Sequence, residues 1–217
     1  MSRHKQRKFN ELAGFENFYA NPFSFKGVWS EKVFSNQRPI TLELGCGKGE
    51  FSLQLGKQFP ERNFIGIDLD GARLWRAAKN ALAECLSNVA FIQMNIDKIE
   101  EAFAPGEVSE IWIPFPDPYP KPSKWKKRLI STVFLERYKK IIQNGSILHF
   151  KTDNSHLFDF GIKSIQESGY LIISQTNDLY HSPLQNEFNT IPSYFESIFM
   201  AKGESIKYVM FKFVDEK

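Results

Sequence analysis

The sequence predicts an α/β fold in which helices cover both faces of a mostly parallel sheet. Two observations indicate it: short apolar runs alternate with longer amphipathic segments from Pro39 onward, and acidic or amide residues follow several of those runs. The chain has 217 residues, of which 42% are hydrophobic and 24% charged, so it can bury one sizeable core. We expect one domain over residues 39–217, preceded by a basic and aromatic segment, residues 1–38.

The expected strands are seven short apolar runs rich in β-branched and aromatic residues. In chain order they cover residues 40–44, 63–68, 89–94, 110–113, 146–151, 170–174 and 206–214. Four intervening segments, residues 50–59, 70–86, 131–142 and 154–168, are the expected helices. Since ligands on parallel sheets bind beyond the carboxyl ends of the strands, the polar residues there should share one rim. These residues are Glu43, Asp68, Asn95, Asp117 and Asp153.

Positive charge is clustered although the formal net charge is only +3. One cluster, "RHKQRK", opens the chain in what we expect to be a mobile arm that leads into a packing segment. A second cluster is the basic loop that contains Lys121, Lys124, Lys126, Lys127 and Arg128. Such clusters are typical of phosphate binding.

Several classes of protein are disfavoured by composition. The chain has two cysteines without a CxxC or Cys/His pattern, so we expect neither a zinc site nor a disulfide framework. The basic N-terminus is followed by polar residues rather than an apolar core, and no apolar run is long enough to cross a bilayer. We therefore expect a cytoplasmic protein, a monomer or homodimer, without a metal or a membrane partner.

A glycine-rich turn, "ELGCGKGEF", follows the first expected strand. It contains Gly45, Gly47 and Gly49 but matches neither the dinucleotide fingerprint nor the P-loop. Glycine lets backbone approach a ligand closely, and the preceding Glu43 disfavours a pyrophosphate but suits a cation. S-adenosylmethionine, with a positive sulfonium and amino group, fits this turn. Asp68, at the end of the next strand, is placed to accept both ribose hydroxyls.

The stretch "IPFPDPYPKP" has a proline at every second position from Pro114 to Pro122. Each intervening residue precedes a proline and is therefore expected to be extended: Phe115, Asp117, Tyr119 and Lys121. So stiff a segment can hold Asp117 firmly in a loop that stays open to a large substrate.

The segment "PFPDPYPKPSKWKKRL" resembles the F-P-D-P-W-P-K-x-x-H-x-K-R-R-L segment of the tRNA (guanine-N7-)-methyltransferases. The motifs "ELGCGKGEF", "HFKTDN" and "SYFESIF" occur in that family's order, so the resemblance extends from about Ile40 to the C-terminus. It implies a Rossmann-like class I methyltransferase fold with a seven-stranded sheet. It also implies that the variable-loop guanine of tRNA receives a methyl group from S-adenosyl-L-methionine at N7.

Matched position by position, the resemblance implies three sets of site residues. The catalytic acid is Asp117. The cofactor-binding residues are Glu43, Gly45, Gly47, Asp68, Asn95 and Asp117. The substrate-contact residues are Lys121, Asp153, Ser193, Tyr194, Phe195 and Glu196.

The chain departs from the family's pattern at several of these positions. Asp68 stands where the family usually has Glu, and Asn95 replaces an Asp that contacts the adenine amino group. Tyr119 replaces a Trp, Ser193 replaces a Thr, and Lys124 stands near the usual His. Each replacement retains a group that can make a related contact.

Three later residues have a structural interpretation beside the functional one. Asn154 is a plausible N-cap, and Ser193 with Glu196 forms the S-x-x-E pattern of a capping box. On physical grounds capping is favoured for the pair, while the resemblance implies both capping and substrate contact. His149, inside an expected strand, is interpreted as a packed residue.

Two rival functions stay open at this stage. "PDPYP" is similar to the D-P-P-Y loop of amino-group methyltransferases of nucleic acid, but the second proline and the tyrosine are in the wrong order. The other rival is a non-catalytic RNA-binding module built on a methyltransferase fold. Analysis of the methylated nucleoside would distinguish all three.

Overall fold

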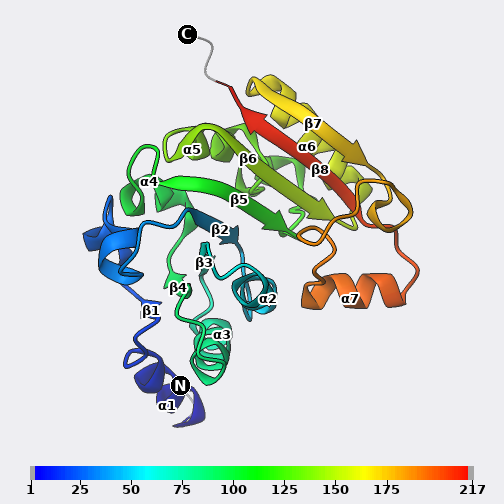
Figure 1. The fold of residues 1–217 in the computed structure, drawn as a ribbon. Coiled ribbons are helices and arrows are strands. Elements are labelled where there is room, and N and C mark those ends of the chain that lie inside the picture. The colour runs from blue at the N-terminus through cyan, green and yellow to red at the C-terminus, as the bar shows by residue number, and fades with distance from the viewer. Residues whose placement is uncertain (1–2, 215–217) are drawn as a thin grey trace.

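A computed structural model describes residues 3–214, except the side chains of residues 3–5, Tyr194 and Phe195. Its centre is a single sheet of eight strands in the order β1-β4-β3-β2-β5-β6-β8-β7 (Figure 1). The strands are β1 (Phe18–Tyr19), β2 (Ile40–Leu44), β3 (Asn63–Asp68), β4 (Val89–Gln93), β5 (Val108–Pro114), β6 (Ile142–Thr152), β7 (Tyr170–Thr176) and β8 (Lys207–Phe213).

Seven α-helices accompany the sheet within the described residues. They are α1 (Arg3–Leu12), α2 (Glu50–Gln58), α3 (Gly71–Ala83), α4 (Ile99–Ala102), α5 (Thr132–Lys139), α6 (Ser155–Glu167) and α7 (Tyr194–Ala201). Short 3₁₀ turns are η1 (Pro22–Phe25), η3 (Ile96–Lys98), η4 (Pro122–Lys127) and η5 (Leu179–His181), and η2 (Trp29–Val33) is a π turn.

The predicted fold class is confirmed. Neighbouring strands from β1 to β6 pair in parallel, and β8 is antiparallel to both β6 and β7. All seven expected strands are present, and the eighth is the two-residue β1. Too short to carry an alternating pattern, β1 depends on Asn17, whose carbonyl accepts the Phe91 N–H and whose side chain donates to Ala78 O at 3.0 Å.

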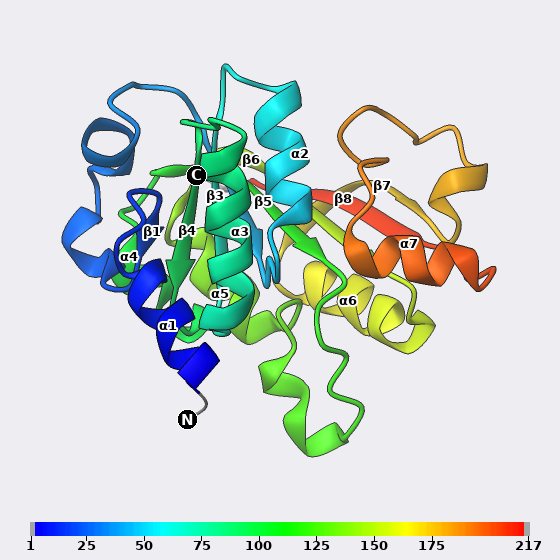
Figure 2. The ribbon, with the colours of Figure 1, turned by 90° about the horizontal axis from the view of Figure 1, so that it is seen from below.

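Apolar side chains form two clusters, one against each face of the sheet. Leu12, Phe51 and Leu74 belong to the cluster under α1, α2 and α3, whereas Phe134 and Leu157 belong to the cluster under α5 and α6. Figure 2 shows α1, α2, α3 and α7 on the side that faces the viewer. Burial on both faces explains why the central strands read as continuous apolar runs.

The N-terminal segment packs on the domain. Leu12 is buried, and Glu11 of α1 accepts a hydrogen bond from the Trp75 indole of α3 at 3.1 Å. The end of α1, at Glu11 and Leu12, therefore packs on the domain, and the mobility of the residues before it stays a prediction. The division of the chain after residue 38 stays a prediction.

Two absences can be stated for residues 3–214. No described helix has the length and apolarity of a membrane span. Nor do three His, Cys, Asp or Glu residues gather anywhere in this part of the chain so that they could hold a metal ion.

Candidate active site

The five predicted rim residues lie near or beyond the carboxyl ends of five neighbouring strands, at one edge of the sheet. In spatial order these strands are β4, β3, β2, β5 and β6, all parallel. Asn95 and Asp68 therefore lie on one side of the glycine turn, and Asp117 and Asp153 on the other. Glu43 lies inside β2, one residue before its end.

The glycine turn is fixed by backbone bonds to β3. The N–H groups of Gly45 and Cys46 both donate to Ile67 O, at 2.8 and 3.0 Å. The Gly47 N–H donates to Oδ2 of Asp68 at 2.8 Å, and Oδ1 of Asp68 accepts the Asp70 N–H at 2.8 Å. Each Asp68 oxygen retains accepting capacity, because a carboxylate offers about four lone-pair sites.

Glycine is required for different physical reasons at different positions of the turn. Gly47 has φ +57°, and a Cβ added there would meet no heavy atom within 4 Å. Gly49 also has positive φ, but its Cβ would lie 2.7 Å from the Phe91 ring and 2.8 Å from Ala77. Gly49 is thus required by helix–sheet packing, whereas Gly47 presents backbone to open space where a ligand can lie.

Glu43 is buried beneath this turn. Its Oε2 accepts the Ser52 N–H at 3.0 Å and a short hydrogen bond from the Ser52 hydroxyl. Burial raises the pKa of Glu43 to about 8, with smaller contributions from Glu50 and Asp68 and against the two bonds from Ser52. The side chain is therefore mostly protonated near pH 7, and a bound cation would favour its ionised form.

Asn95 is exposed at the rim and caps the following 3₁₀ turn. Its amide oxygen accepts the Asp97 N–H at 3.1 Å, and its amide nitrogen donates to the Asp97 carboxylate at 3.0 Å. The oxygen that was expected to receive an adenine amino group is thus already an N-cap acceptor. Its second lone pair is the one left for a ligand.

The proline loop departs from the sequence expectation in part. Lys121 is extended as predicted, but Phe115 and Tyr119 have φ of +51° and +38°, so the prediction is wrong for these two. Tertiary bonds override the local preference: the Phe115 N–H donates to Lys151 O at 2.8 Å. The Phe115 ring also packs 5.8 Å from that of Phe199.

Asp117 lies at the exposed centre of the proline loop, with Pro116 buried beside it. The loop leaves the sheet edge and ends in η4, the projecting segment at the bottom of Figure 2. The Asp117 carboxylate is therefore accessible to a large substrate, as the sequence indicated.

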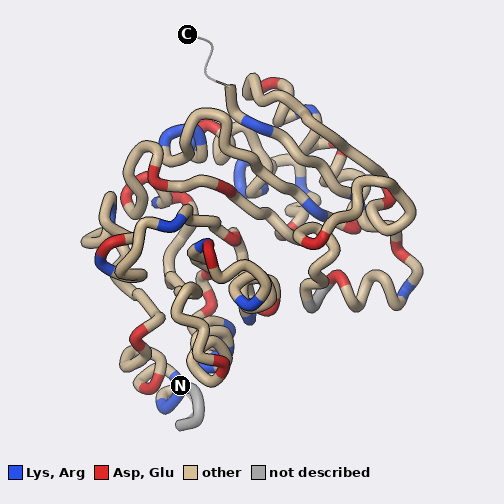
Figure 3. Tube along the Cα trace, viewed as in Figure 1, with Lys and Arg blue, Asp and Glu red and all other residues tan. Residues whose placement is uncertain are grey.

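The basic loop divides into two kinds of residue. Lys121, Lys124, Lys126 and Lys127 are exposed on or next to η4. Arg128 instead donates to the backbone of the proline loop, a role that no local pattern in the sequence indicates. Figure 3 shows further Lys and Arg along α1 and α3.

Asp153 follows β6 and is half-buried. Burial raises the pKa of its carboxyl group, with Glu204 contributing in the same direction and Lys207 and Lys202 opposing. Its backbone carbonyl accepts a hydrogen bond from the Lys207 ammonium at 3.0 Å.

The segment from Ser193 to Glu196 begins α7 with the capping box that the sequence indicated. The Ser193 hydroxyl accepts the Glu196 N–H, and the Glu196 carboxylate accepts the Ser193 N–H, both at 3.2 Å. Glu196 has no exposed surface, and the Lys151 ammonium and the Tyr180 hydroxyl donate to it. Glu196 is thus buried in this arrangement, and its expected contact with a substrate stays a prediction. Tyr194 and Phe195 lie outside the described side chains.

The N-cap interpretation of Asn154 and the packed role of His149 are confirmed. The Asn154 side chain accepts the Leu157 N–H at 2.9 Å. His149 is buried, and its ring stacks on Trp112 with centroids 3.8 Å apart.

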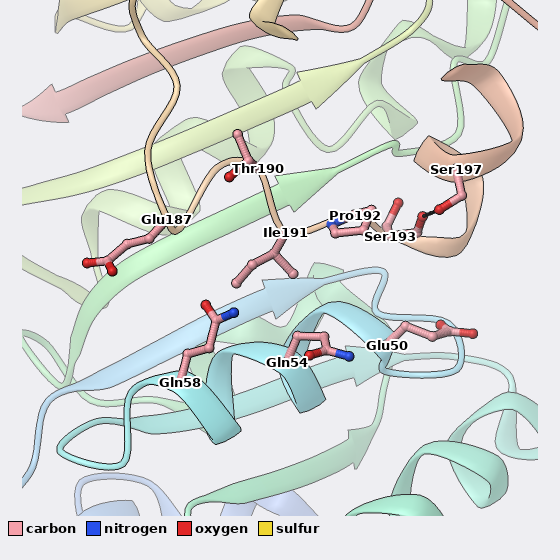
Figure 4. Close-up of a pocket in the computed structure, with 9 residues that line it drawn as sticks. All are labelled: Glu50, Gln54, Gln58, Glu187, Thr190, Ile191, Pro192, Ser193 and Ser197. Atoms are coloured by element: carbon pink, nitrogen blue, oxygen red, sulfur yellow. Dashed lines mark hydrogen bonds between the residues drawn. The ribbon is translucent and has the colours of Figure 1, made fainter. Parts of the chain in front are cut away.

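A groove of about 460 Å³ separates α2 from the chain that precedes α7 (Figure 4). Glu50, directly after the glycine turn, marks one end of it. The other lining residues are Gln54, Gln58, Glu187, Thr190, Ile191, Pro192, Ser193 and Ser197. The lining has amides, hydroxyls and carboxylates but no cation, so it suits a neutral polar group better than a phosphate.

Comparison with known proteins identifies relatives across nearly the whole chain. Residues 37–209 match the family model described as "Putative methyltransferase". The tRNA (guanine-N(7)-)-methyltransferase of Christiangramia forsetii is 44% identical, covering 97% of this chain and 98% of its own. Those of Bacteroides fragilis and Bacillus subtilis are 42% and 36% identical, covering 97% and 86% of this chain and 86% of each relative.

Solved structures share the fold at low sequence identity. The 16S rRNA methyltransferase KamB aligns with a TM-score of 0.67 at 13% identity, covering 88% of this chain and 95% of its own. A structure described as an antibiotic-related methyltransferase aligns with a TM-score of 0.63 at 18% identity, covering 83% and 89%. These likenesses show a methyltransferase fold.

Proposed function

The chain belongs to the tRNA (guanine-N7-)-methyltransferase family, and on that premise we propose that it transfers a methyl group from S-adenosyl-L-methionine to N7 of a guanine in tRNA. One observation carries the proposal beyond family membership. The glycine turn and the loop that presents Asp117 follow β2 and β5, which are adjacent parallel strands. A cofactor on the turn and a base beside Asp117 would therefore meet at one edge of the sheet.

The residues present fit this cofactor. Gly47 leaves open space at the turn, because an added Cβ there would meet no heavy atom within 4 Å. Asp68 accepts the Gly47 N–H and keeps further lone pairs for ribose hydroxyls. Glu43 lies beneath the turn as a buried acid that a positive charge would ionise. Together with Gly45 and Asn95 these residues would bind S-adenosyl-L-methionine, which supplies a methyl group on a positively charged sulfur.

Guanine needs little chemical help in this reaction. Its N7 carries an in-plane lone pair, so no base has to remove a proton before attack. The N7–carbon bond forms as the sulfur–carbon bond breaks, and the electron pair of the broken bond stays on sulfur. The protein therefore acts chiefly by alignment of N7 with the methyl group.

Asp117 is the proposed catalytic residue. The methylated guanine ring is cationic, so a fixed carboxylate beside it stabilises the charge that develops during transfer. The exposed position of Asp117, held in the proline loop, supports this role. It also allows the carboxylate to orient the base before reaction.

Lysines on η4 are proposed to bind the phosphates of tRNA, which position the substrate without reading its sequence. The residues proposed as further substrate contacts are those that the family's pattern implies: Lys121, Asp153, Ser193, Tyr194, Phe195 and Glu196. We further propose that the acceptor is the variable-loop guanine, and that the protein acts in the cytoplasm as a monomer or homodimer.

Mass spectrometry of nucleosides tests the reaction. Unmodified tRNA transcripts are incubated with the protein and S-adenosyl-L-methionine, digested, and compared with a reaction that contains Asp117→Ala. The expected product is 7-methylguanosine with the wild-type protein alone. Formation of N6-methyladenosine instead, or of no methylated nucleoside, would refute the proposal.

A further inference from the structure

Arg128 closes the proline loop from the outside. Its Nε donates to Pro118 O at 3.0 Å and its Nη2 to Tyr119 O at 3.1 Å. The guanidinium lies over the Phe160 ring of α6, 4.3 Å from the centroid. The Arg128 guanidinium is therefore held by the Phe160 ring, and it donates to the carbonyls of the two residues directly after Asp117.

The loop needs these hydrogen bonds because its prolines alone do not determine its conformation. Proline fixes its own φ and disfavours helical backbone in the residue before it, which then prefers to be extended. Phe115 and Tyr119, two residues on either side of Asp117, instead have positive φ. A residue other than glycine is strained at positive φ, and this conformation persists only where the surroundings enforce it.

Each strained residue forms a backbone hydrogen bond to a residue outside the loop. The Phe115 N–H is bound by the carbonyl of Lys151, at the end of β6. Tyr119 is bound through its own carbonyl by Arg128. Asp117 lies midway between these two restraints, so the direction of its carboxylate depends on both.

We propose that Arg128 is a positioning residue for Asp117, rather than a phosphate contact like the lysines around it. The proposal rests on the proposed methyl transfer. Only a planar guanidinium can donate along two fixed directions and stack on Phe160 at once, whereas a lysine ammonium is a compact point charge. Arg128→Lys should therefore fail to replace Arg128, although it keeps the charge.

The test compares five proteins: wild type, Arg128→Lys, Arg128→Ala, Lys127→Ala and Arg38→Lys. Lys127 is the exposed neighbour on η4, and Arg38 is exposed at the opposite edge of the sheet, before β2. Three quantities are measured: the single-turnover rate at saturating tRNA and cofactor, the salt dependence of tRNA affinity, and cofactor affinity by calorimetry.

We expect Arg128→Lys to lower the single-turnover rate about 10- to 100-fold, because small misplacement of a reacting group has effects of this size. Its cofactor affinity and salt slope should equal those of wild type, which a general loss of folding would not allow. Lys127→Ala should make the salt slope shallower, and Arg38→Lys should match wild type. A wild-type single-turnover rate in Arg128→Lys would overturn the proposal. It would also be overturned if Arg128→Ala made the salt slope as shallow as Lys127→Ala does, because Arg128 would then be a phosphate contact.

Hydrogen exchange separates failure of this proposal from failure of the proposed function. Between Pro114 and Pro122 four amides can exchange, those of Phe115, Asp117, Tyr119 and Lys121, since the other residues are prolines. The Phe115 N–H is bound to Lys151 O, so the amides that report on Arg128 are the other three. Their exchange should quicken in Arg128→Lys and stay unchanged in Arg38→Lys, whether or not tRNA is methylated. Unchanged exchange in Arg128→Lys would refute the restraint itself.

Discussion

The ammonium of Lys151 lies 2.7 Å from Oε2 of Glu196, and neither side chain has any exposed surface. Lys151 also donates to Asn189 O at 2.8 Å. Through these bonds the end of β6 holds both α7 and the chain that precedes it. Since the Lys151 carbonyl accepts the Phe115 N–H, one residue of β6 joins α7 and the chain before it to the start of the proline loop.

Removal of one partner of this pair should be strongly destabilising. Glu196→Gln leaves the Lys151 charge buried without a counter-ion, which typically costs about 3–5 kcal/mol of unfolding free energy. Urea denaturation measures the loss, with Glu167→Gln of the exposed Lys163 pair as the control, expected to lose less than about 1 kcal/mol. Equal losses of unfolding free energy in the two variants would show that the buried pair contributes no more to stability than an exposed pair does.

Cofactor binding should release a proton from Glu43 near neutral pH. The pKa of Glu43 is raised to about 8, so most molecules carry this proton below pH 8. A cationic ligand favours the carboxylate and lowers the pKa in the complex, so affinity should rise with pH until about pH 8 and then level off.

Calorimetry in two buffers with different ionisation enthalpies measures the proton released by Glu43. The isosteric Glu43→Gln cannot release it, so subtraction of its signal removes the contribution of the cofactor's own amino group. Identical proton release in both proteins would contradict the prediction.

The sequence was most informative where local chemistry determines structure. The apolar run of β2, the glycines of the turn and the caps Asn154 and Ser193 each act through neighbours in the chain, and all were located correctly. Conformations that depend on distant partners were not. Positive φ at Phe115 requires the carbonyl of Lys151, which no local pattern reveals.

The surroundings of two charged residues could not be predicted for the same reason. Arg128 was grouped with exposed lysines, because composition alone cannot tell a guanidinium bound to carbonyls from one in water. The burial of Glu196 could not be predicted, because its partner Lys151 lies 45 residues earlier in the chain. Long-range pairing of this kind becomes visible only when the strands are assembled.

Asp117→Asn should impair chemistry while it preserves cofactor binding. The substitution keeps the shape of the side chain but removes the charge proposed to stabilise the cationic product, so we expect turnover to fall about 10²–10³-fold. Rapid-quench measurement of 7-methylguanosine gives the rate, and calorimetry gives cofactor affinity. Near-normal turnover would remove Asp117 from the catalytic role.

Asp68→Ala should show the reverse pattern. Its carboxylate bonds the Gly47 N–H and is placed for the ribose hydroxyls, so its loss removes a ligand contact and loosens the turn. We expect cofactor affinity to fall at least about tenfold, the equivalent of one hydrogen bond to a charged group. tRNA affinity, measured by filter binding without cofactor, should stay within twofold. Unchanged cofactor affinity would argue against the ribose contact.

The exposed lysines of η4 should make tRNA affinity strongly salt-dependent. Each phosphate contact contributes about −0.7 to −0.9 to the slope of log affinity against log salt, so Lys126→Ala with Lys127→Ala should make the slope shallower by about 1.5. Arg7 and Lys8 of α1 should contribute a smaller change, since Lys8 already lies 4.6 Å from the centre of the Trp75 ring.

The control for this slope is a double variant of Lys32 and Arg38, both exposed near the amino ends of the strands, opposite the rim. The control also removes two positive charges, so it changes the net charge by the same amount as the η4 double variant. If the η4 lysines contact phosphates, their slope changes and that of the control does not. If the basic loop is merely a solvated surface, both double variants keep the wild-type slope. Equal shallowing in both would mean that tRNA responds to total charge rather than to η4.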